Sequence, residues 1–230
     1  MSEPLTHNIQ DYLKTIYSLT SDGEEASTSA LAVRLGISPP SVTEMLQKLS
    51  SLQPPLVIYQ KHRGAHLTTE GKLSALEVLR HHRLLESYLF KSLGYPRDAV
   101  HEEACRLEHV ISEEFEKRIS DLLGNPLRDP HGAPIPSPEL VMPTTNDIPL
   151  SGLRVGEKAV IRCVGDEDSA LLRRMESLGL VPGAILEIFD YSSHDHTLTM
   201  KIDSHQAIVL DASISRNIFI EKIYETQRSD

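Results

Sequence analysis

Prolines divide this chain into two parts that must fold in different ways. Seven of its 14 prolines lie between Gly124 and Pro149, where no periodic apolar pattern is present. Proline fixes φ and lacks a backbone N–H, so this stretch is a poor candidate for a helix or a central strand. The sequence therefore predicts a linker or an ordered loop here, with one folded part before it and another after it.

The part before the prolines is predicted to be mainly helical, because its apolar residues recur three and four positions apart. Gly36 is suited to ending one helix. Ser38 is suited to capping the next helix, in which Pro39 and Pro40 occupy the tolerant first turn. Helices are expected over residues 9–19, 28–35, 39–52, 69–93, 98–109 and 113–123, with a hairpin of two extended stretches over residues 56–59 and 65–67.

The part after the prolines, Leu153 to Ile223, is predicted to be a small β-rich unit. Strands are expected over residues 158–163, 184–190, 197–202, 206–210 and 216–222, with one short helix over residues 168–178. No apolar run approaches the roughly 18 residues of a membrane span. The first residues also lack the basic stretch and apolar core of a secretory signal.

Charge and cysteine content narrow the functional classes. The net charge of −10 argues against a simple basic nucleic-acid binder. Such an excess of acids is most often a device for solubility, and the alternative is a sink for divalent cations. The first 75 residues hold seven acids and six bases, a net charge of −1, so the acids gather later in the chain. Two cysteines are too few for a disulfide framework, so a reducing cytoplasm is the expected location, with no membrane partner.

The helices expected over 28–35 and 39–52, followed by the hairpin, form a winged helix-turn-helix pattern. The second helix would bury its apolar face and offer small hydroxyl, proline and polar side chains to a major groove, while bases at the hairpin tip suit phosphates. The candidate DNA-contacting residues are Ser38, Pro39, Pro40, Ser41, Thr43, Glu44, Gln47, Lys48, Lys61 and Arg63. The alternative is a three-helix packing unit without a DNA partner. Because the segment is weakly basic, a homodimer that adds contacts over two half-sites of double-stranded DNA is favoured.

A segment shortly before the prolines combines several residue types that bind metals. On one continuous helix, an arc of roughly 100° would hold four of them, namely His101, Cys105, Glu108 and His109. His82 and Glu86 share a face of the preceding helix, and Asp11 can add a carboxylate from the first helix. Any one of these residues alone would be an ordinary solvated or core side chain. The combination predicts a divalent-metal site.

The donor types limit the metal and the chemistry. Carboxylates and imidazoles suit Mn(II) and Fe(II), a thiolate favours iron, cobalt or zinc, and a closed zinc site would want more cysteine or histidine. A metal-dependent hydrolase using Glu108 with His101 and His109 is an alternative function, but no HExxH motif or nucleophile elbow is present. A third alternative is a metal-transport accessory or interaction module based on the β-rich part alone.

Three segments resemble the diphtheria toxin repressor family, namely the N-terminal winged helix, residues 80–86 (RHHRLLE) and residues 100–112 (VHEEACRLEHVIS). The tail from Leu153, with the turn LGLVPG at 178–183, resembles the SH3-like domain of that family, which is akin to ferrous-iron transport accessory proteins. The resemblance covers essentially the whole chain. It implies a winged helix-turn-helix domain at 1–74, a helical metal-binding and dimerisation domain at 75–143, and a small all-β SH3-like domain at 150–226.

The resemblance implies a metal-activated repressor rather than an enzyme, in which metal binding orders the DNA-binding units of a homodimer for an operator. The implied primary ligands are Asp11, Cys105, Glu108 and His109. The implied ancillary ligands are His82, Glu86, His101, His131 and an acid between Asp166 and Asp168, with Asp168 as the candidate.

The ligand set departs from both types of the family. Iron-type members have a methionine where this chain has Asp11, and many manganese-type members have a glutamate where it has Cys105. A further manganese-type ligand position, one turn after Asp11, is Lys14 here and cannot serve. Asp11 favours manganese and Cys105 favours iron. Mn(II) is therefore the expected metal, with Fe(II) as the alternative.

Overall fold

The structure, a computed structural model, describes residues 5–21, 26–165, 168–194, 196–203 and 207–224. The chain forms two compact units, which are described separately below. The first comprises Met1–His82, Arg106–Glu116 and Pro136–Met142, and the second comprises Arg83–Cys105, Lys117–Ile135 and Pro143–Asp230. No helix in the described ranges is long and apolar enough to cross a membrane.

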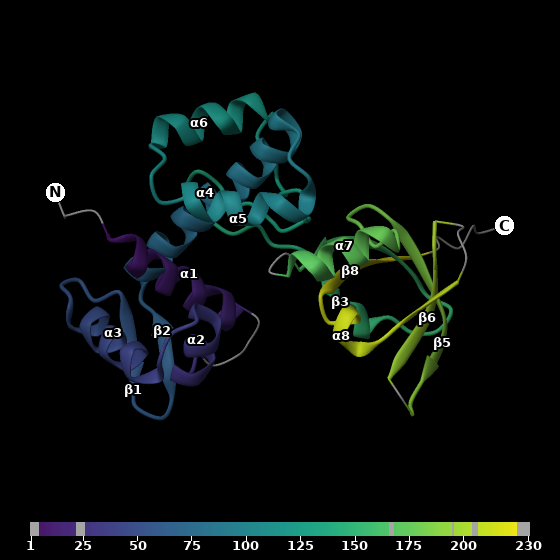
Figure 1. The fold of residues 1–230 in the computed structure, drawn as a ribbon, viewed down its shortest axis with the longest axis horizontal. Coiled ribbons are helices and arrows are strands. Elements are labelled where there is room, and N and C mark those ends of the chain that lie inside the picture. The colour runs from purple at the N-terminus through teal and green to yellow at the C-terminus, as the bar shows by residue number, and fades with distance from the viewer. Residues whose placement is uncertain (1–4, 22–25, 166–167, 195, 204–206, 225–230) are drawn as a thin grey trace. The chain divides into compact units, whose positions relative to one another are not determined.

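The first unit begins with three helices and a hairpin (Figure 1), namely α1 (His7–Ser21), α2 (Thr28–Leu35), α3 (Pro39–Ser51), β1 (Val57–Gln60) and β2 (Gly64–Leu67). Leu13 and Ile16 of α1 share one core with Leu46 and Leu49 of α3, and all four side chains are fully buried. This helical spacing of apolar residues is what the sequence predicts. The winged helix-turn-helix architecture expected here is therefore present.

The boundaries of α2 and α3 follow from their capping residues. The Ser38 hydroxyl accepts a hydrogen bond from the backbone N–H of Ser41, with Pro39 and Pro40 in the first turn of α3. Gly36 ends α2 with a φ of 66°, a left-handed conformation that favours glycine. These local signals were predicted correctly. The hairpin differs slightly, because β1 and β2 pair from Val57↔Leu67 to Gln60↔Gly64 around a three-residue tip.

Three further helices follow, namely α4 (Thr69–Leu93), α5 (Arg97–Leu107) and α6 (Glu113–Leu122). The ends of α4 are as predicted, and α6 stops one residue earlier than expected. The prediction that α5 runs to His109 was wrong. The helix ends at Leu107, and the N–H of Val110 donates to the carbonyl of Leu107 in a tight turn. Glu108 and His109 therefore lie in a turn and not on the face of α5.

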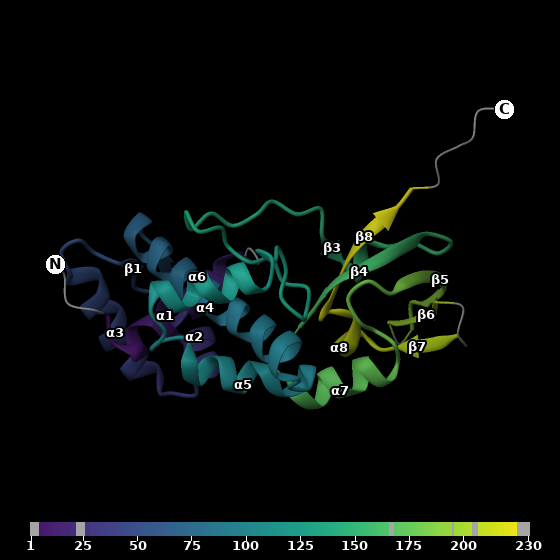
Figure 2. The same cartoon turned by 90° about the horizontal axis from the view of Figure 1, so that it is seen from above.

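The proline-rich stretch between α6 and the next strand is an ordered loop without a helix or extended strand (Figure 2). In the first unit, Arg80 donates a 2.6 Å hydrogen bond to the carbonyl of Pro136. In the second unit, Asp129 accepts hydrogen bonds from the N–H groups of His131 and Ala133, at 2.8 and 2.9 Å. Of the two predicted possibilities, linker or ordered loop, the second is correct.

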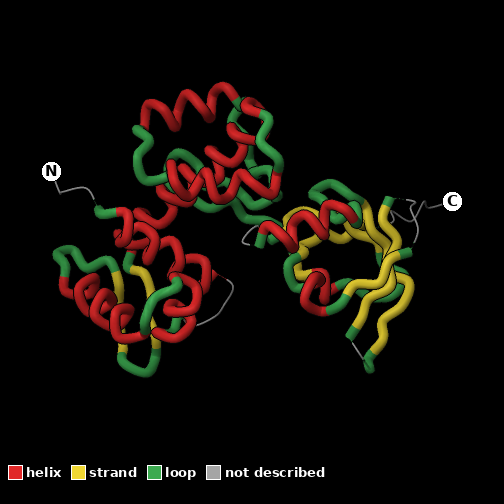
Figure 3. Tube along the Cα trace, in the orientation of Figure 1, coloured by secondary structure: helices red, strands yellow, loops and turns green. Residues whose placement is uncertain are grey.

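The second unit ends in an antiparallel six-stranded sheet with order β3-β8-β4-β5-β6-β7. Figure 3 shows the strands in yellow. Its elements are β3 (Ile148–Pro149), η1 (Leu150–Gly152), β4 (Lys158–Val164), α7 (Ser169–Ser177), β5 (Ile185–Ser192), β6 (Thr197–Ile202), β7 (Ile208–Leu210), α8 (Ala212–Ser215) and β8 (Ile218–Ile223). Alternating apolar residues of these strands form a core of their own. The predicted all-β character is confirmed. The short elements β3, η1 and α8 were not predicted.

Candidate metal centre

The first unit gathers three predicted ligands into one cluster. Ligand atoms of Asp11, Glu108 and His109 all lie within 4.8 Å of one another. His109 Nε2 is 3.1 Å from Asp11 Oδ1 and 3.3 Å from Glu108 Oε1. Two carboxylates and an imidazole converging on one point form a donor set that suits a divalent cation. The residues present therefore fit the metal that the sequence predicts.

Each side chain reaches this cluster for a local reason. Asp11 lies on the polar side of α1, beside the buried Tyr12 and Leu13, and its side chain is 45% exposed. Glu108 and His109 come from the turn after α5, and their side chains are 0% and 7% exposed. The cluster thus has one accessible carboxylate and two buried ligands, which leaves a path for an ion to enter at Asp11.

The neighbours of His109 determine the orientation of its imidazole ring. Its Nδ1 lies 2.8 Å from Gln10 Oε1, which can only accept a hydrogen bond, so Nδ1 carries the proton. The other nitrogen, Nε2, faces Asp11 Oδ1 and Glu108 Oε1, a position from which it could bind a cation placed between the two carboxylates. The ring also stacks on His7, with centroids 4.9 Å apart. The histidine is therefore oriented as a metal ligand by its surroundings.

Glu108 is held as a carboxylate although it is buried. Burial raises the pKa of this carboxyl group, but the hydrogen bond with His82 and the charge of Lys14 outweigh burial and keep the pKa below its ordinary value. His82 Nδ1 lies 2.5 Å from Glu108 Oε2, and Lys14 Nζ forms an ion pair with Glu108 Oε1. His82, predicted as an ancillary ligand, thus contacts the primary glutamate.

A second cluster of ligand atoms lies in the second unit. Atoms of Glu86, Asp129 and His131 lie within 4.8 Å of one another, and all three residues are buried. His131 Nε2 donates to the carbonyl of Arg97 at 3.0 Å, so Nδ1 carries the lone pair and faces Glu86 Oε2 at 3.6 Å. Asp129 was not among the predicted ligands. The signal that could have found it is its place two residues before His131 in the segment Asp129–Gly132.

His101 and Cys105 lie in the second unit, on α5. His101 Nδ1 is 3.3 Å from Glu86 Oε1, and Cys105 Sγ is 3.7 Å from His101 Nε2. Cys105 belongs to the second unit while Asp11, Glu108 and His109 belong to the first. The four-residue primary set therefore stays a prediction.

The loop that bears His131 is fitted closely against β4. The carbonyl of His131 accepts from the N–H of Val164 at 2.9 Å. A Cβ atom on Gly132, which has a φ of 90°, would lie 1.8 Å from the carbonyl oxygen of Arg162. Only glycine allows this approach. The contact holds the second cluster against the sheet.

Asp168 has a visible structural role. Its carboxylate caps α7 by accepting from the N–H groups of Ala170 and Leu171, at 2.9 and 3.0 Å. Its assignment as an ancillary ligand stays a prediction, and Asp166 lies outside the described residues.

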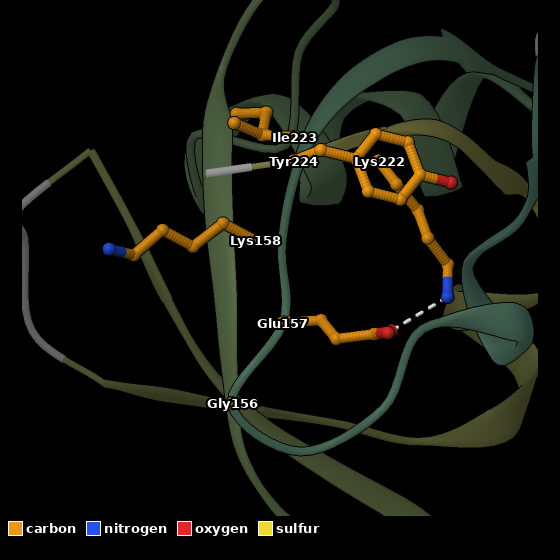
Figure 4. A pocket seen from close by; sticks show the side chains of 6 residues that line it. All are labelled: Gly156, Glu157, Lys158, Lys222, Ile223 and Tyr224. Carbon is orange, nitrogen blue, oxygen red and sulfur yellow. Dashed lines mark hydrogen bonds and ion pairs between the residues drawn. The ribbon is translucent and has the colours of Figure 1, made fainter. Parts of the chain in front are cut away.

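The sheet also has a hollow of about 280 Å³, which is no candidate site. Figure 4 shows its lining residues, Gly156, Glu157, Lys158, Lys222, Ile223 and Tyr224. Glu157 and Lys222 form an ion pair of 2.8 Å there. The hollow is an open surface feature lined by paired charges.

The predicted DNA-contacting residues lie on the surface of the first unit. All are exposed except Thr43, which is half-buried. Three hydroxyl groups are engaged at α3. Ser38 caps the helix, the hydroxyl groups of Ser38 and Ser41 share a hydrogen bond of 2.9 Å, and Thr43 donates to the carbonyl of Pro39 at 3.1 Å. Lys61 and Arg63 lie at the hairpin tip. The assignment of these ten residues to DNA stays a prediction.

Comparison with known protein families covers the chain in three consecutive segments. Residues 4–65 match the N-terminal DNA-binding domain of iron-dependent repressors, and residues 68–137 match their metal-binding and dimerisation domain. Residues 148–222 match the FeoA domain. An SH3-like C-terminal part is thereby supported.

One relative aligns along nearly the whole chain and another along about two thirds of it. The iron-dependent repressor IdeR of Mycobacterium bovis is 31% identical over 231 residues, which cover 95% of this chain and 99% of the relative. The diphtheria toxin repressor of Corynebacterium glutamicum is 36% identical over 150 residues, or 65% of each chain.

Solved structures of metal-dependent repressors also resemble this chain over nearly its whole length. A manganese-dependent transcriptional repressor in complex with manganese has a TM-score of 0.86 and 34% identity, over 94% of this chain and 100% of that chain. The manganese regulator SloR has a TM-score of 0.81 and 33% identity, over 95% and 100%. These relatives are repressors and not enzymes, so the hydrolase alternative is dropped. This chain belongs to the diphtheria toxin repressor family of iron- and manganese-dependent, DNA-binding transcriptional repressors.

Proposed function

We propose that this chain represses genes of metal homeostasis by binding operator DNA as a homodimer in the cytoplasm, with Mn(II) as the activating ion and Fe(II) as the alternative. One observation supports this most. Asp11 of α1 meets Glu108 and His109 of the turn after α5 in a single donor cluster. The cluster therefore links the first helix of the DNA-binding part to the metal-binding and dimerisation segment.

The proposed primary ligands are Asp11, Cys105, Glu108 and His109. The carboxylates and the imidazole suit Mn(II), and the Cys105 thiolate is the softer ligand that keeps Fe(II) as the alternative. A cation bound there would supply the positive charge that holds two carboxylates together. The side chain of Asp11 is 45% exposed, and those of Glu108 and His109 are nearly buried. Asp11 is therefore the ligand whose movement costs the least free energy when no metal is bound.

A change in the position of α1 would affect DNA binding through the core that α1 shares with α3. Leu13 and Ile16 of α1 pack in the same core as Leu46 and Leu49 of α3, the helix proposed to enter the major groove. A fixed position for Asp11 relative to Glu108 and His109 therefore restricts the orientation of α3. This coupling is a rigid-body effect of a packed helix, which requires no change inside the core.

We also propose a second divalent-cation site at Glu86, Asp129 and His131. All three are buried, and His131 presents its Nδ1 lone pair toward Glu86. His101 contacts Glu86 from α5, with its Nδ1 3.3 Å from Glu86 Oε1, and is a further candidate donor in that unit. The site adds Asp129 to the predicted ancillary set. His82, which contacts Glu108, and Asp168, which caps α7, stay weaker candidates.

A homodimer is proposed because the matched family segment is described as metal-binding and dimerising. Large apolar side chains near it are exposed, including Val110 at 63% and Phe115 at 43%. Two copies would also double the phosphate contacts of a DNA-binding part whose net charge is close to zero, and each contact adds to the affinity for DNA.

The test of this function is a gel mobility shift with a fragment of the promoter that precedes a metal-transport gene. We expect a shift with MnCl2, a weaker or equal one with anaerobic Fe(II), and none after chelation with EDTA. Absence of any metal-dependent shift, with protein shown to be folded and dimeric, would refute the proposal. A shift that persists in EDTA would leave DNA binding but remove metal control.

The hairpin tip makes a separate prediction. Lys61→Ala is expected to weaken operator binding on all sequences and to reduce the slope of log K against log salt by about 1, because one phosphate contact is lost. The measurement is DNA affinity by fluorescence anisotropy across a salt series. Lys201→Ala, an exposed lysine on β6, is the matched control and should leave the slope unchanged. An unchanged slope for Lys61→Ala would show that Lys61 does not contact a DNA phosphate.

A further inference from the structure

Lys14 forms an ion pair with Glu108, one of the proposed primary ligands. Lys14 lies three residues after Asp11 on α1, so the two side chains project from the same side of the helix. Its Nζ forms an ion pair with Glu108 Oε1, across 94 positions of sequence. The Lys14 side chain is 20% exposed and that of Glu108 is 0% exposed. This ion pair is therefore largely shielded from water.

Lys14 is paired with the same oxygen of Glu108 that lies in the donor cluster. Glu108 Oε1 is also the atom that lies 3.3 Å from His109 Nε2, which in turn lies 3.1 Å from Asp11 Oδ1. The other oxygen, Oε2, is engaged by His82 Nδ1 at 2.5 Å. Both oxygens of Glu108 thus have hydrogen-bonding partners within the protein. A cation held by Asp11, Glu108 and His109 would have to share or displace one of them.

We propose that Lys14 is a tethered competitor of the activating metal, whose ammonium group neutralises Glu108 in the metal-free protein and withdraws from Oε1 when a divalent cation binds. This inference rests on the proposed metal site and adds to it a residue that sets the affinity. Lys14 is the partner that can leave, because its flexible side chain is partly exposed and can reach water. His82 is 5% exposed and has no such path.

Competition predicts two effects of opposite sign. Removal of the lysine charge leaves Glu108 less compensated, so the metal-free protein becomes less stable. The same removal abolishes the displacement that metal binding requires, so the affinity for metal rises. A lysine with a merely structural role would give the first effect without the second, because a loosened site binds metal more weakly.

The main experiment is calorimetric titration of the full-length protein with MnCl2. Lys14→Met, which removes the charge and keeps an unbranched side chain only one atom shorter, is expected to bind manganese about tenfold more tightly than the wild type. Lys14→Arg keeps the charge and is expected to bind close to the wild-type value. Lys72→Met, an exposed lysine on α4, is the matched control and should change nothing. Melting temperature should fall for metal-free Lys14→Met and fall less when manganese is present.

A second measurement uses the wild type and so does not depend on a variant that folds. Acetylation of lysines, followed by mass spectrometry, should show Lys14 protected relative to Lys72 without metal and more reactive with MnCl2. Tighter binding by Lys14→Met or a rise in Lys14 reactivity supports competition. Unchanged or weaker binding together with unchanged reactivity overturns it, while manganese binding that still requires His109 would leave the proposed metal site standing. If the wild type binds no manganese, both proposals fail together.

Discussion

Replacement of His109 by alanine is expected to abolish metal-dependent operator binding while the protein stays folded. His109 Nε2 contacts both carboxylates of the primary cluster, at 3.1 Å from Asp11 and 3.3 Å from Glu108. Loss of an oriented imidazole should lower metal affinity by roughly a hundredfold or more. Without that ligand, Asp11 and Glu108 have no bridge between them. The measurements are manganese titration and the gel mobility shift.

The fold should survive because His109 lies in the turn after α5 and outside the apolar core of the first unit. Apart from Asp11 and Glu108, its contacts are with Gln10 and the ring of His7, which are both at least partly exposed to water. Circular dichroism and melting temperature provide the check. His194→Ala, an exposed histidine of the β5–β6 hairpin, is the control and should bind metal and DNA as the wild type does. A His109→Ala protein that still shifts DNA with manganese would remove this cluster as the switch.

Features decided by neighbours in sequence were predictable. Ser38, Pro39 and Pro40 define the start of α3 by capping and first-turn geometry, and Gly36 defines the end of α2 by its positive φ. The long helix α4 was predicted to end at Leu93, before Gly94, and does so. These signals act within one turn of the chain, so a single sequence contains all the information that they need.

Features decided by distant neighbours were not predictable. The helical pattern continues through Glu108 and His109, yet α5 ends at Leu107. In the structure, the turn lets Glu108 become fully buried beside His82 and Lys14, and Lys14 is 94 positions away. Helix propensity cannot show such a partner, because tertiary contacts routinely override it at the last turn.

The candidate ligands divide in the same way. Asp11, Glu108 and His109 were selected by residue type and resemblance, and the structure brings them within 4.8 Å. Asp129 was missed because its partner Glu86 lies on a helix far earlier in the chain, and only the folded loop brings the two together. Lys14 was set aside as a residue that cannot bind metal. Its ion pair with Glu108 became visible only in the structure.

Glu116→Ala is expected to be strongly destabilising, although Glu116 lies outside the metal sites. Glu116 of α6 accepts from Arg80 Nε at 2.5 Å and pairs with His81 Nε2 at 3.1 Å, both on α4. The three side chains are 15%, 6% and 10% exposed. Removal of the carboxylate leaves two cationic groups in a poorly hydrated site, which costs about 3 kcal/mol. Glu113→Ala, exposed on the same helix, should cost less than about 0.5 kcal/mol.

The dependence of this loss on pH identifies its cause. Burial raises the pKa of Glu116, but His81 and Arg80 outweigh it and keep the pKa below its ordinary value of about 4.5. Burial lowers the pKa of His81, but Glu116 and the Glu108 carbonyl raise it above its ordinary value of about 6.5. The glutamate therefore stabilises the fold above pH 4.5, and this is lost as pH falls through its folded pKa. The histidine stabilises it below pH 6.5, and this is lost as pH rises through its folded pKa.

The difference in unfolding free energy between wild type and Glu116→Ala should consequently be largest between about pH 4.5 and 6.5. Above that window it should shrink but not vanish, because Arg80 keeps its charge and still pairs with Glu116. Urea unfolding of the metal-free protein at several pH values measures this directly. The variant His81→Gln separates the contributions of Arg80 and His81. In this background, the effect of Glu116→Ala on the unfolding free energy should no longer decline above pH 6.5 but should still decline on acidification. A difference that is flat from pH 4 to 8 would show that Glu116 stabilises the fold by packing rather than by its charge.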